Sequence, residues 1–169
     1  MNLEIRSATL ADIPLIRELT MQVWPQTYTP IIGAEQVNYM LDRFYNPEAL
    51  RQQIEGGHKF LLAYDNGEPV AFASYSETEP QIYKLHKLYI IAGQQGKGIG
   101  RILIDNIVED LKQRKVSALR LNVNKYNTAA QAFYEKTGFR QILEEDIDIG
   151  NGYFMNDYVL ALLINDGIF

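Results

Sequence analysis

The strongest hydrophobic pattern in the chain lies in its middle, between residues 85 and 111. A strand-like apolar run leads there through a glycine-rich segment into a stripe of apolar residues that recur every four positions. The stripe consists of Ile99, Leu103, Ile107 and Leu111, widened by Ile102, Ile104 and Val108. This spacing predicts an amphipathic helix that begins directly after a glycine-rich loop.

The N-terminal part of the chain has mostly helical periodicity. The predicted elements there are a strand over residues 3–7, a helix from Thr9 to Trp24, a loop over residues 26–33, a helix with Val37, Met40, Leu41 and Phe44 on its apolar face, and a short helix from Asn46-Pro47 to Ile54. The first helix is expected to stop at Trp24-Pro25, because proline biases the preceding residue out of the helical region.

From Lys59 onward, strand patterns alternate with two helices. The predicted elements are strands over 60–64 and 70–75 joined by the turn Asp65-Asn66-Gly67, a strand over 81–90, the central helix, a strand over 118–124, a helix over 128–136 ended by Gly138, and a closing hairpin of residues 139–149 and 153–163. This order predicts a mixed α/β domain of the α+β type with a largely antiparallel sheet.

The glycine-rich loop predicts a site for phosphate or pyrophosphate. Its glycines are Gly93, Gly96, Gly98 and Gly100. Because glycine has no Cβ, backbone N–H groups can close on an anion at a helix N-terminus. A nucleotide P-loop is excluded, since Ile99 and Gly100 follow Gly98 where lysine and a hydroxyl residue are required. The dinucleotide fingerprint fails because Arg101 stands at its third glycine. A tight turn feeding a core helix is the alternative.

Two motifs together resemble those of the GNAT acetyltransferases. Gln95-Gly96-Lys97-Gly98-Ile99-Gly100 matches the pattern Q/R-x-x-G-x-G/A, and residues 127–139 are similar to the family's N-x-x-A-x-x-F-Y-x-K-x-G-F helix. The second motif follows a predicted strand, as in the family. The resemblance covers roughly residues 60–164. It implies a single GNAT domain over residues 1–169, with a mixed, mostly antiparallel twisted sheet of about seven strands flanked by helices.

The resemblance implies acetyl-CoA as cosubstrate. Backbone amides from Gln95 to Gly100 suit its pyrophosphate, and Lys97 and Arg101 add charge unless they form only a solvated helix start. The preceding strand end is expected to pair with pantetheine and to supply the oxyanion N–H. The implied cofactor-binding residues are Leu88, Tyr89, Ile90, Gln95, Gly96, Lys97, Gly98, Ile99, Gly100, Arg101, Asn127 and Tyr134.

Tyr134 is the predicted general acid toward the CoA thiolate. In the family pattern Asn127 contacts the cofactor, and the tyrosine position donates the proton. Asn127 and Tyr134 are seven residues apart and therefore share one helix face, about 10 Å apart along the axis. A tyrosine hydroxyl, with a pKa of about 10, is protonated at pH 7 and can donate. The alternative is that Tyr134 only packs, as Phe133 is expected to do.

The general base is not defined by the two motifs. Many relatives carry a glutamate near the position of Lys84, and lysine is protonated unless it is strongly desolvated. His86 lies two residues along on the same strand face and can accept an amine proton. The serotonin N-acetyltransferases similarly use histidine on this strand. A water relay is the alternative.

The acceptor pocket is expected among the N-terminal helices, whose layout is similar to that of bacterial polyamine acetyltransferases of the PaiA type. The aromatic candidates are Trp24, Tyr28, Tyr39, Phe44 and Tyr45, which line a pocket or form core. A polyamine is favoured by the acidic Glu77, Glu79, Glu144, Glu145, Asp146 and Asp148 and opposed by Lys84 and Lys87.

Composition narrows the class of protein. The 169 residues include no cysteine, which excludes a disulfide framework and a cysteine nucleophile. The net charge of −5 argues against nucleic-acid binding. No signal or membrane-spanning pattern occurs, so a cytoplasmic monomer or homodimer is expected. The predicted function is acetyl transfer, without a metal, to a primary amine of a small molecule or peptide. The alternative is a non-catalytic CoA-binding or interaction module.

Overall fold

The structure is a computed structural model that describes residues 1–165. The strand order of its seven-stranded sheet is β1-β2-β3-β4-β5-β7-β6. The elements are β1 (Leu3–Ser7), the 3₁₀ helix η1 (Leu10–Asp12), α1 (Ile13–Ile32), α2 (Ala34–Phe44), α3 (Pro47–Glu55), β2 (Lys59–Asp65), β3 (Glu68–Glu79), β4 (Ile82–Ile90), α4 (Ile99–Gln113), β5 (Ala118–Asn124), α5 (Thr128–Lys136), β6 (Arg140–Gly150) and β7 (Tyr153–Leu163). The predicted mixed, mostly antiparallel fold class is confirmed.

The chain divides into two compact units. The first unit contains residues 1–76 and 87–105, and the second contains residues 77–86 and those from 106 onward. β3, β4 and α4 each contribute residues to both units. The single domain predicted over residues 1–169 stays a prediction, and its last four residues lie outside the described part of the chain.

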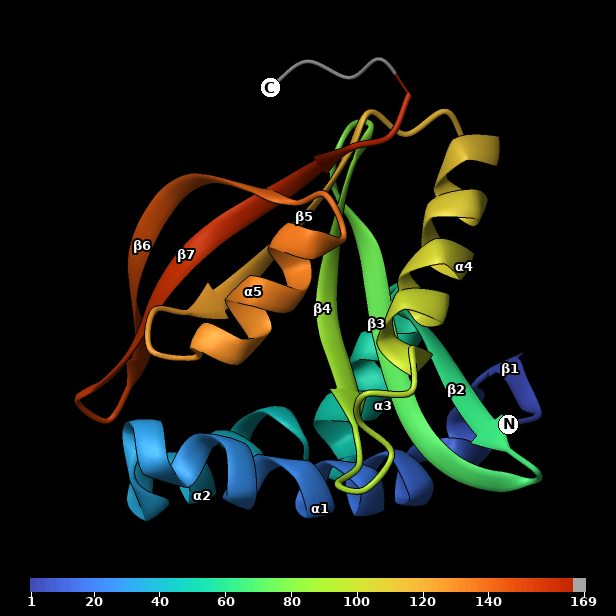
Figure 1. Cartoon of the computed structure of the whole chain (residues 1–169). Helices are drawn as coiled ribbons and strands as arrows, with labels where there is room; N and C mark the ends of the chain where they lie inside the picture. The colour runs from blue at the N-terminus through green and yellow to red at the C-terminus, as the bar shows by residue number, and fades with distance from the viewer. Residues whose placement is uncertain (166–169) are drawn as a thin grey trace. The chain divides into compact units, whose positions relative to one another are not determined.

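The hairpin predicted at Asp65-Asn66-Gly67 joins β2 and β3 in the first unit (Figure 1). Asn66 and Gly67 have φ angles of 51° and 82°. Two successive left-handed residues are typical of the turn whose twist matches antiparallel strands, and Asn-Gly is its preferred sequence. β1 pairs antiparallel with β2, and the Asn2 N–H donates to Oδ1 of Asp65 at 3.0 Å.

The predicted end of the first helix at Trp24-Pro25 is wrong. Helix α1 continues to Ile32 and contains both Pro25 and Pro30, so the loop predicted over residues 26–33 does not exist. The helix ends at Gly33, whose φ of 83° is left-handed and whose N–H donates to the Thr29 carbonyl at 3.0 Å. Each internal proline removes one helical hydrogen bond, so another interaction must hold this part of the helix.

Aromatic packing supplies that interaction. Trp24 is only 5% exposed, and its ring lies 4.5 Å from that of Tyr28, one turn further along α1. The Trp24 ring also lies 5.4 Å from the ring of Tyr45, which follows α2. Burial of large aromatic side chains contributes several times the free energy of one exposed hydrogen bond. The tertiary contacts therefore outweigh the local effect of the prolines.

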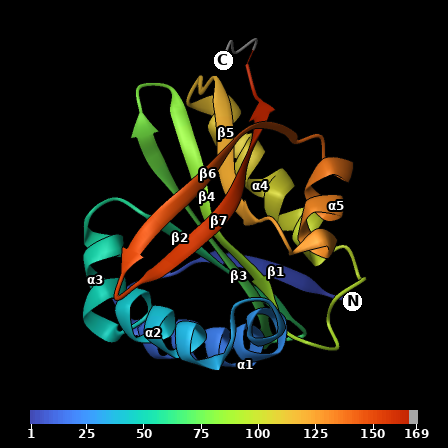
Figure 2. The ribbon, with the colours of Figure 1, turned by 90° about the vertical axis from the view of Figure 1, so that its left-hand side faces the viewer.

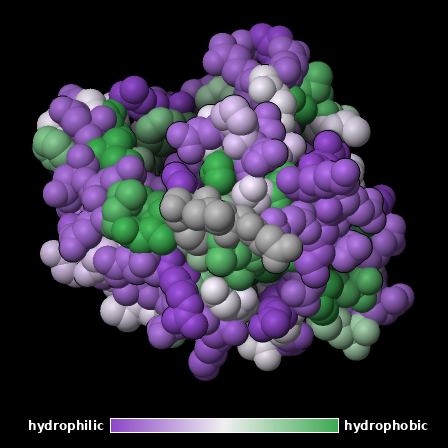
Figure 3. Space-filling model, turned by 90° about the horizontal axis from the view of Figure 1, so that it is seen from above, coloured by the Kyte–Doolittle hydropathy of each residue, from purple (hydrophilic) through white to green (hydrophobic). Residues whose placement is uncertain are grey.

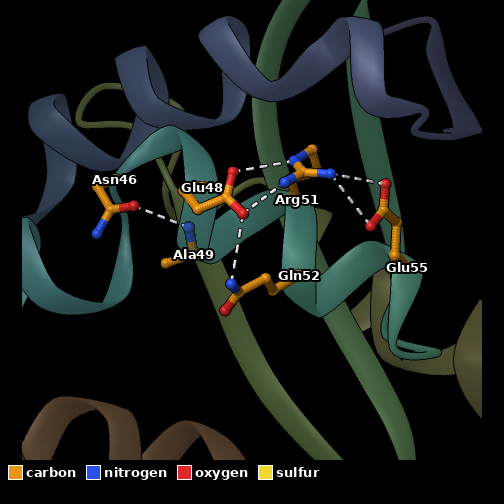
Figure 4. Close-up of polar contacts among 6 residues, drawn as sticks. All are labelled: Asn46, Glu48, Ala49, Arg51, Gln52 and Glu55. Carbon is orange, nitrogen blue, oxygen red and sulfur yellow. Dashed lines mark hydrogen bonds and ion pairs between the residues drawn. The ribbon is translucent and has the colours of Figure 1, made fainter.

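Helix α3 begins where the sequence predicts and ends at Glu55, one residue later than predicted. Oδ1 of Asn46 accepts from the Ala49 N–H at 2.8 Å, and Pro47 occupies the first helical position (Figure 4). Arg51 lies between Glu48 and Glu55, one turn away on either side, and makes an ion pair with each (Figure 4). The cap fixes the first turn, and the exposed ion pairs add only a little stability.

The apolar stripe of α4 is buried except at Ile102, which is exposed, and Val108, which is half-buried. The buried members are Ile99, Leu103, Ile104, Ile107 and Leu111. Ile102, which was expected to widen the stripe, is 39% exposed, so that part of the prediction is wrong. Ile102 lies three positions after Ile99 but on the side of the helix that carries Arg101 and Asp105, both exposed.

In the second unit, β4 and β5 pair in parallel, and β7 pairs antiparallel with both β5 and β6. The closing hairpin predicted around Gly150-Asn151-Gly152 is confirmed as the long β6–β7 ribbon (Figure 2). β5 and α5 have the bounds expected from the sequence. This unit therefore presents side chains of four neighbouring strands, β4, β5, β7 and β6, in a known register.

The surface is polar with separate apolar groups. On the face seen in Figure 3, hydrophilic side chains predominate and hydrophobic ones occur in small patches, which is ordinary for a globular protein. Among residues 1–165, no helix is long and apolar enough to cross a membrane.

Candidate active site

The glycine-rich loop between β4 and α4 has a backbone that only glycine adopts easily. Gly93, Gly96 and Gly98 have φ angles of 86°, 79° and 80°. A Cβ placed on any of them would meet no atom within 4 Å. The glycines are therefore required by the backbone conformation and not by crowding within the loop. Alternation of left- and right-handed residues turns successive N–H groups toward one side, which makes a concave site for an anion.

Helix α4 begins directly at this loop. The Ile102 N–H donates to the Gly98 carbonyl at 3.1 Å, which is the first helical hydrogen bond. The N–H groups of residues 98–101 therefore have no acceptor within the helix. Free N–H groups at the positive end of a helix dipole are suited to a phosphate group. This geometry fits the predicted pyrophosphate site.

The cationic side chains of the loop make only exposed contacts within the first unit. Nζ of Lys97 donates to Oε1 of Gln94 at 3.0 Å, and Nε of Arg101 lies 3.4 Å from Oδ1 of Asp105. An exposed ion pair contributes about 0–1 kcal/mol. Both side chains can therefore turn toward a bound phosphate at little cost. Their role in binding stays a prediction.

The end of β4, predicted to pair with pantetheine, comprises residues 88–90. Its last carbonyl, that of Ile90, accepts from Nε2 of Gln95 at 3.3 Å, so the loop folds back on the strand. One residue later, the Ile91 N–H donates to the Val70 carbonyl of β3 at 3.0 Å. The side chains of residues 88–90 are half-buried. Strand end and loop are thus held together as one local structure.

Three of the aromatic residues expected in the acceptor pocket form a cluster with Tyr89. The Trp24 ring lies 4.5, 5.4 and 6.1 Å from the rings of Tyr28, Tyr45 and Tyr89. Burial raises the pKa of Tyr45 above its ordinary value, so its hydroxyl stays protonated. Because Tyr89 belongs to the strand end described above, this cluster adjoins the predicted pantetheine-binding backbone. Trp24 and Tyr45 are buried, so these two rings pack as core, and the role of the cluster in an acceptor pocket stays a prediction.

The other two aromatic candidates lie elsewhere in the first unit. Nη1 of Arg43 donates to the Tyr39 hydroxyl at 2.7 Å, and the same guanidinium lies 5.5 Å from the Phe44 ring centroid. These residues form a surface group around one arginine. The described ring contacts thus join three of the five predicted aromatic residues, Trp24, Tyr28 and Tyr45, with Tyr89.

Lys87 is buried in the first unit, with 8% of its surface exposed. Its Nζ lies 4.9 Å from the ring centroid of Tyr45 and 5.7 Å from that of Phe60. Both distances are within the range of a cation–π interaction. An ammonium group is thus already held on the face of an aromatic ring that belongs to the cluster.

Asn127 and Tyr134 lie on α5 in the second unit. Oδ1 of Asn127 accepts from the Ala130 N–H at 3.3 Å and so caps the helix. The Tyr134 ring lies 5.2 Å from Phe133 and 5.5 Å from Phe139. Both residues therefore have a structural role. Their predicted roles toward the cofactor and the thiolate stay predictions.

His86 and Lys84 lie on β4 in the second unit and are half-buried, whereas Leu85 between them is buried. Alternation along a strand puts His86 and Lys84 on the same face. Lys84 lies opposite Arg120 of β5 in the register. The role of His86 as base is not tested by this arrangement and stays a prediction.

The sequence reasoning missed Asp157. This residue of β7 is only 6% exposed, and Nδ2 of Asn122 donates to its Oδ2 at 3.2 Å. Burial raises the pKa of the Asp157 carboxyl, and the nearby Glu145 carboxylate raises it further, while Asn122 and the positive charges of Lys84 and Lys125 lower it. The available signal was a single acidic residue inside the otherwise apolar and neutral strand 153–163.

The described residues also form a cavity of about 410 Å³ in the second unit. It is lined by Gln131, Glu135, Phe139, Arg140, Gln141, Tyr158 and Leu160. None of the predicted site residues lines it, so it is not taken as the active site.

The predicted site residues fall into two groups. The loop, the strand end and the aromatic cluster form one local structure in the first unit. His86, Asn127 and Tyr134 belong to the second unit, where Asp157 joins them as a buried acidic residue. A glycine-rich loop at the start of a helix, in a mixed α/β fold of this strand order, fits the acetyltransferase class that the motifs indicate.

Comparison with known proteins agrees with that class. Residues 28–161 match the family described as Acetyltransferase (GNAT) domain. The chain therefore belongs to the GNAT acetyltransferase family. It is 26% identical over 160 residues to a spermidine N(1)-acetyltransferase of Thermoplasma acidophilum, covering 92% of this chain and 96% of that protein.

Solved structures show the same fold. The PaiA N-acetyltransferase of T. acidophilum in complex with coenzyme A has a TM-score of 0.82 and 23% identity, covering 96% of this chain and 99% of that one. The ribosomal-protein-S18-alanine N-acetyltransferase of Escherichia coli has a TM-score of 0.74 and 20% identity, covering 99% of both chains. The curated relative is named for spermidine and the E. coli protein for a ribosomal protein, so the fold alone does not select the acceptor.

Proposed function

We propose that this protein transfers the acetyl group of acetyl-CoA directly to a primary amine of a small molecule, with a polyamine-like amine as the leading class and a peptide amine as the second. The choice of acetyl-CoA as the acetyl donor rests on the glycine-rich loop. Its left-handed glycines are open to solvent, and the helix N–H groups beside them have no acceptor within the helix, which suits a pyrophosphate. The spermidine acetyltransferase relative supports the acceptor class.

In this proposal each group has one task. Backbone amides from Gln95 to Gly100 hold the pyrophosphate, and Lys97 and Arg101 add charge. Residues 88–90 align the pantetheine and donate an N–H to the oxyanion. The amine nitrogen attacks the thioester carbonyl, the C–N bond forms, and the C–S bond breaks.

The departing thiolate needs a proton. Tyr134 is proposed to donate it, because a tyrosine hydroxyl is protonated at neutral pH and half-buried beside Phe133 and Phe139. Asn127 is proposed to hold the pantetheine arm. No acyl-enzyme intermediate is required, because the amine attacks the thioester itself.

The experiment that tests the function follows free thiol release from acetyl-CoA over a panel of amines. The panel contains spermidine, putrescine, a free lysine ester and a peptide with a free N-terminus, and acetylated product is confirmed by mass spectrometry. Turnover of at least one amine is expected, with spermidine the best. Absence of CoA binding at millimolar concentration would overturn the proposal. Binding of CoA with no turnover of any amine would favour the non-catalytic module.

A further inference from the structure

The carboxylate of Asp157 is buried but has few partners. It lies in the middle of β7, opposite Asn124 of β5 and opposite Glu145 of β6 in the register. Among residues 1–165 its one hydrogen bond comes from Nδ2 of Asn122, at 3.2 Å. A carboxylate can accept about four hydrogen bonds. Buried polar groups are normally satisfied, so most of the acceptor capacity of Asp157 is available to a ligand or to water.

The charges around Asp157 come from three neighbouring strands. Asn122 of β5 donates both to Asp157 and, at 3.1 Å, to Oε2 of Glu145 on β6. Lys84 of β4 and Lys125, which follows β5, act on Asp157 from a greater distance and favour its ionised form. Lys125 is itself occupied, with Nζ 2.8 Å from Oε2 of Glu144. No described cation therefore makes an ion pair with the Asp157 carboxylate.

Asp157 shares a sheet face with the residues considered for catalysis on β4. Lys84 lies opposite Arg120 of β5, which lies opposite Ala161 of β7. Asp157 is four residues from Ala161 and His86 two from Lys84, so alternation along the strands puts all of them on one face. The buried carboxylate thus lies on the same side of the second unit as the residues that the sequence offers as a base.

We propose that Asp157 is the group that binds the ammonium of the acceptor and removes its proton before acetyl transfer. This assignment rests on the proposed acetyltransferase function and specifies its acceptor as a cationic primary amine. In this proposal Asp157 is the general base, in place of His86 or a water relay. Asn122 is a positioning residue, because it fixes the orientation of the carboxylate that the amine approaches.

The proton balance of the step is complete. The R–NH₃⁺ group transfers one proton to the Asp157 carboxylate, directly or through one water, and becomes R–NH₂. The nitrogen then attacks the thioester, the C–N bond forms, and CoA leaves as a thiolate. The nitrogen loses its second proton and the thiolate gains one, so R–NHCOCH₃ and CoA–SH are released. Asp157 returns its proton to solvent. A buried carboxyl with a raised pKa holds that proton more readily than an exposed one.

A stability measurement separates this role from a structural one. Because its folded-state pKa is raised, the Asp157 carboxyl contributes stability that is present below the unfolded-state pKa and is lost as the pH rises through the folded-state pKa. Asp157→Asn removes this loss. The variant is expected to melt at a higher temperature than the wild type at pH 8 and to lose that advantage at pH 3. A carboxylate kept for structure would give a variant that melts lower at pH 8.

The kinetic test compares Asp157→Asn with Glu145→Gln. Both changes neutralise a carboxylate bonded to Asn122, but Glu145 is exposed. With the best amine of the panel, we expect kcat/KM of Asp157→Asn at pH 7 to fall by about a hundredfold or more and the acidic limb of its pH profile to disappear, in line with general-base contributions. The fall in Glu145→Gln should be at least about tenfold smaller than the fall in Asp157→Asn, and both variants should bind CoA as the wild type does.

The outcomes are distinct. An Asp157→Asn variant that keeps its acidic limb and a kcat/KM within threefold of the wild type overturns this inference alone. Equal losses in the two variants also overturn it, since they would trace the effect to the Asn122 hydrogen bonds. Absence of turnover by the wild type with every amine overturns both the inference and the proposed function. Retained CoA affinity in Asp157→Asn shows that any loss does not come from unfolding.

Discussion

The glycine-rich loop of the first unit and the Asp157 network of the second (Asp157, Asn122 and Glu145) present polar groups in opposite ways. The loop is exposed and offers backbone N–H groups, so its binding capacity depends on φ angles and on the absence of side chains. The Asp157 network is built from side chains and holds a buried carboxylate. The loop should therefore be sensitive to added volume, and Asp157 to an isosteric loss of its charge.

The largest expected effect comes from Gly98→Val, with Gly33→Val as its matched control. Both glycines have φ near +80° and open space around the missing Cβ, at 80° and 83°. A non-glycine residue in such a backbone conformation costs about 1–3 kcal/mol, so denaturant melts should show a loss of stability in both variants. Only Gly98→Val adds a side chain over the phosphate site, and its CoA affinity by isothermal titration should fall by about a hundredfold or more. Equal CoA affinities in the two variants would show that the loop is only a turn.

Tyr134→Phe tests the second unit by removing one oxygen atom. The ring contacts with Phe133 and Phe139 survive, so stability and CoA affinity should stay close to wild type. If the hydroxyl protonates the thiolate, kcat should fall by about a hundredfold. Tyr126→Phe, at a tyrosine that is 70% exposed, removes the same group as a control and should leave kcat unchanged. A normal kcat in Tyr134→Phe would show that Tyr134 has only a packing role.

His86→Gln sharpens the contrast with Asp157. If Asp157 accepts the amine proton, His86→Gln should lower kcat/KM by less than about tenfold and keep the acidic limb of the pH profile. The check is a kcat/KM profile from pH 5 to 9 for both variants on one amine. Loss of that limb in His86→Gln, together with its retention in Asp157→Asn, would restore histidine as the base.

The smallest effects are expected for the loop cations. Lys97→Ala should weaken CoA binding a few-fold, and Arg101→Ala less, because Arg101 already pairs with Asp105 while Lys97 meets only the neutral Gln94. Both effects should shrink between low salt and about 0.5 M salt, because exposed charges are screened. A salt-independent loss in either variant would point to a packing role for the side chain.

Much of the fold could be predicted because its signals are local. Asn46 and Pro47 determine the start of α3, and Asn66-Gly67 determines a hairpin turn, by conformational preferences that need no tertiary context. The path of α1 through Pro25 could not be predicted in this way. It depends on contacts of Trp24 with Tyr45 and Tyr89, which are distant in the sequence.

The candidate site also contains parts with local sequence signals and parts that depend on contacts between distant residues. The glycine loop and the α5 motif are contiguous in sequence and could be recognised from it. Asp157 gains its environment only when β7 lies between β5 and β6, so that Asn122 and Glu145 meet it from both sides. A lone aspartate in a strand carries no motif. Its burial and its hydrogen-bond deficit are properties of the folded sheet.

The two prolines inside α1 also bear on the order in which the protein folds. The half of the helix from Trp24 to Ile32 lacks two of its own hydrogen bonds and depends on aromatic partners that come later in the chain. Such a segment is not expected to be stable as a helix before those partners are in place. We expect truncation of Tyr28 to leave the folding arm of a denaturant chevron nearly unchanged and to raise the unfolding rate. This is the behaviour of residues that become ordered after the transition state.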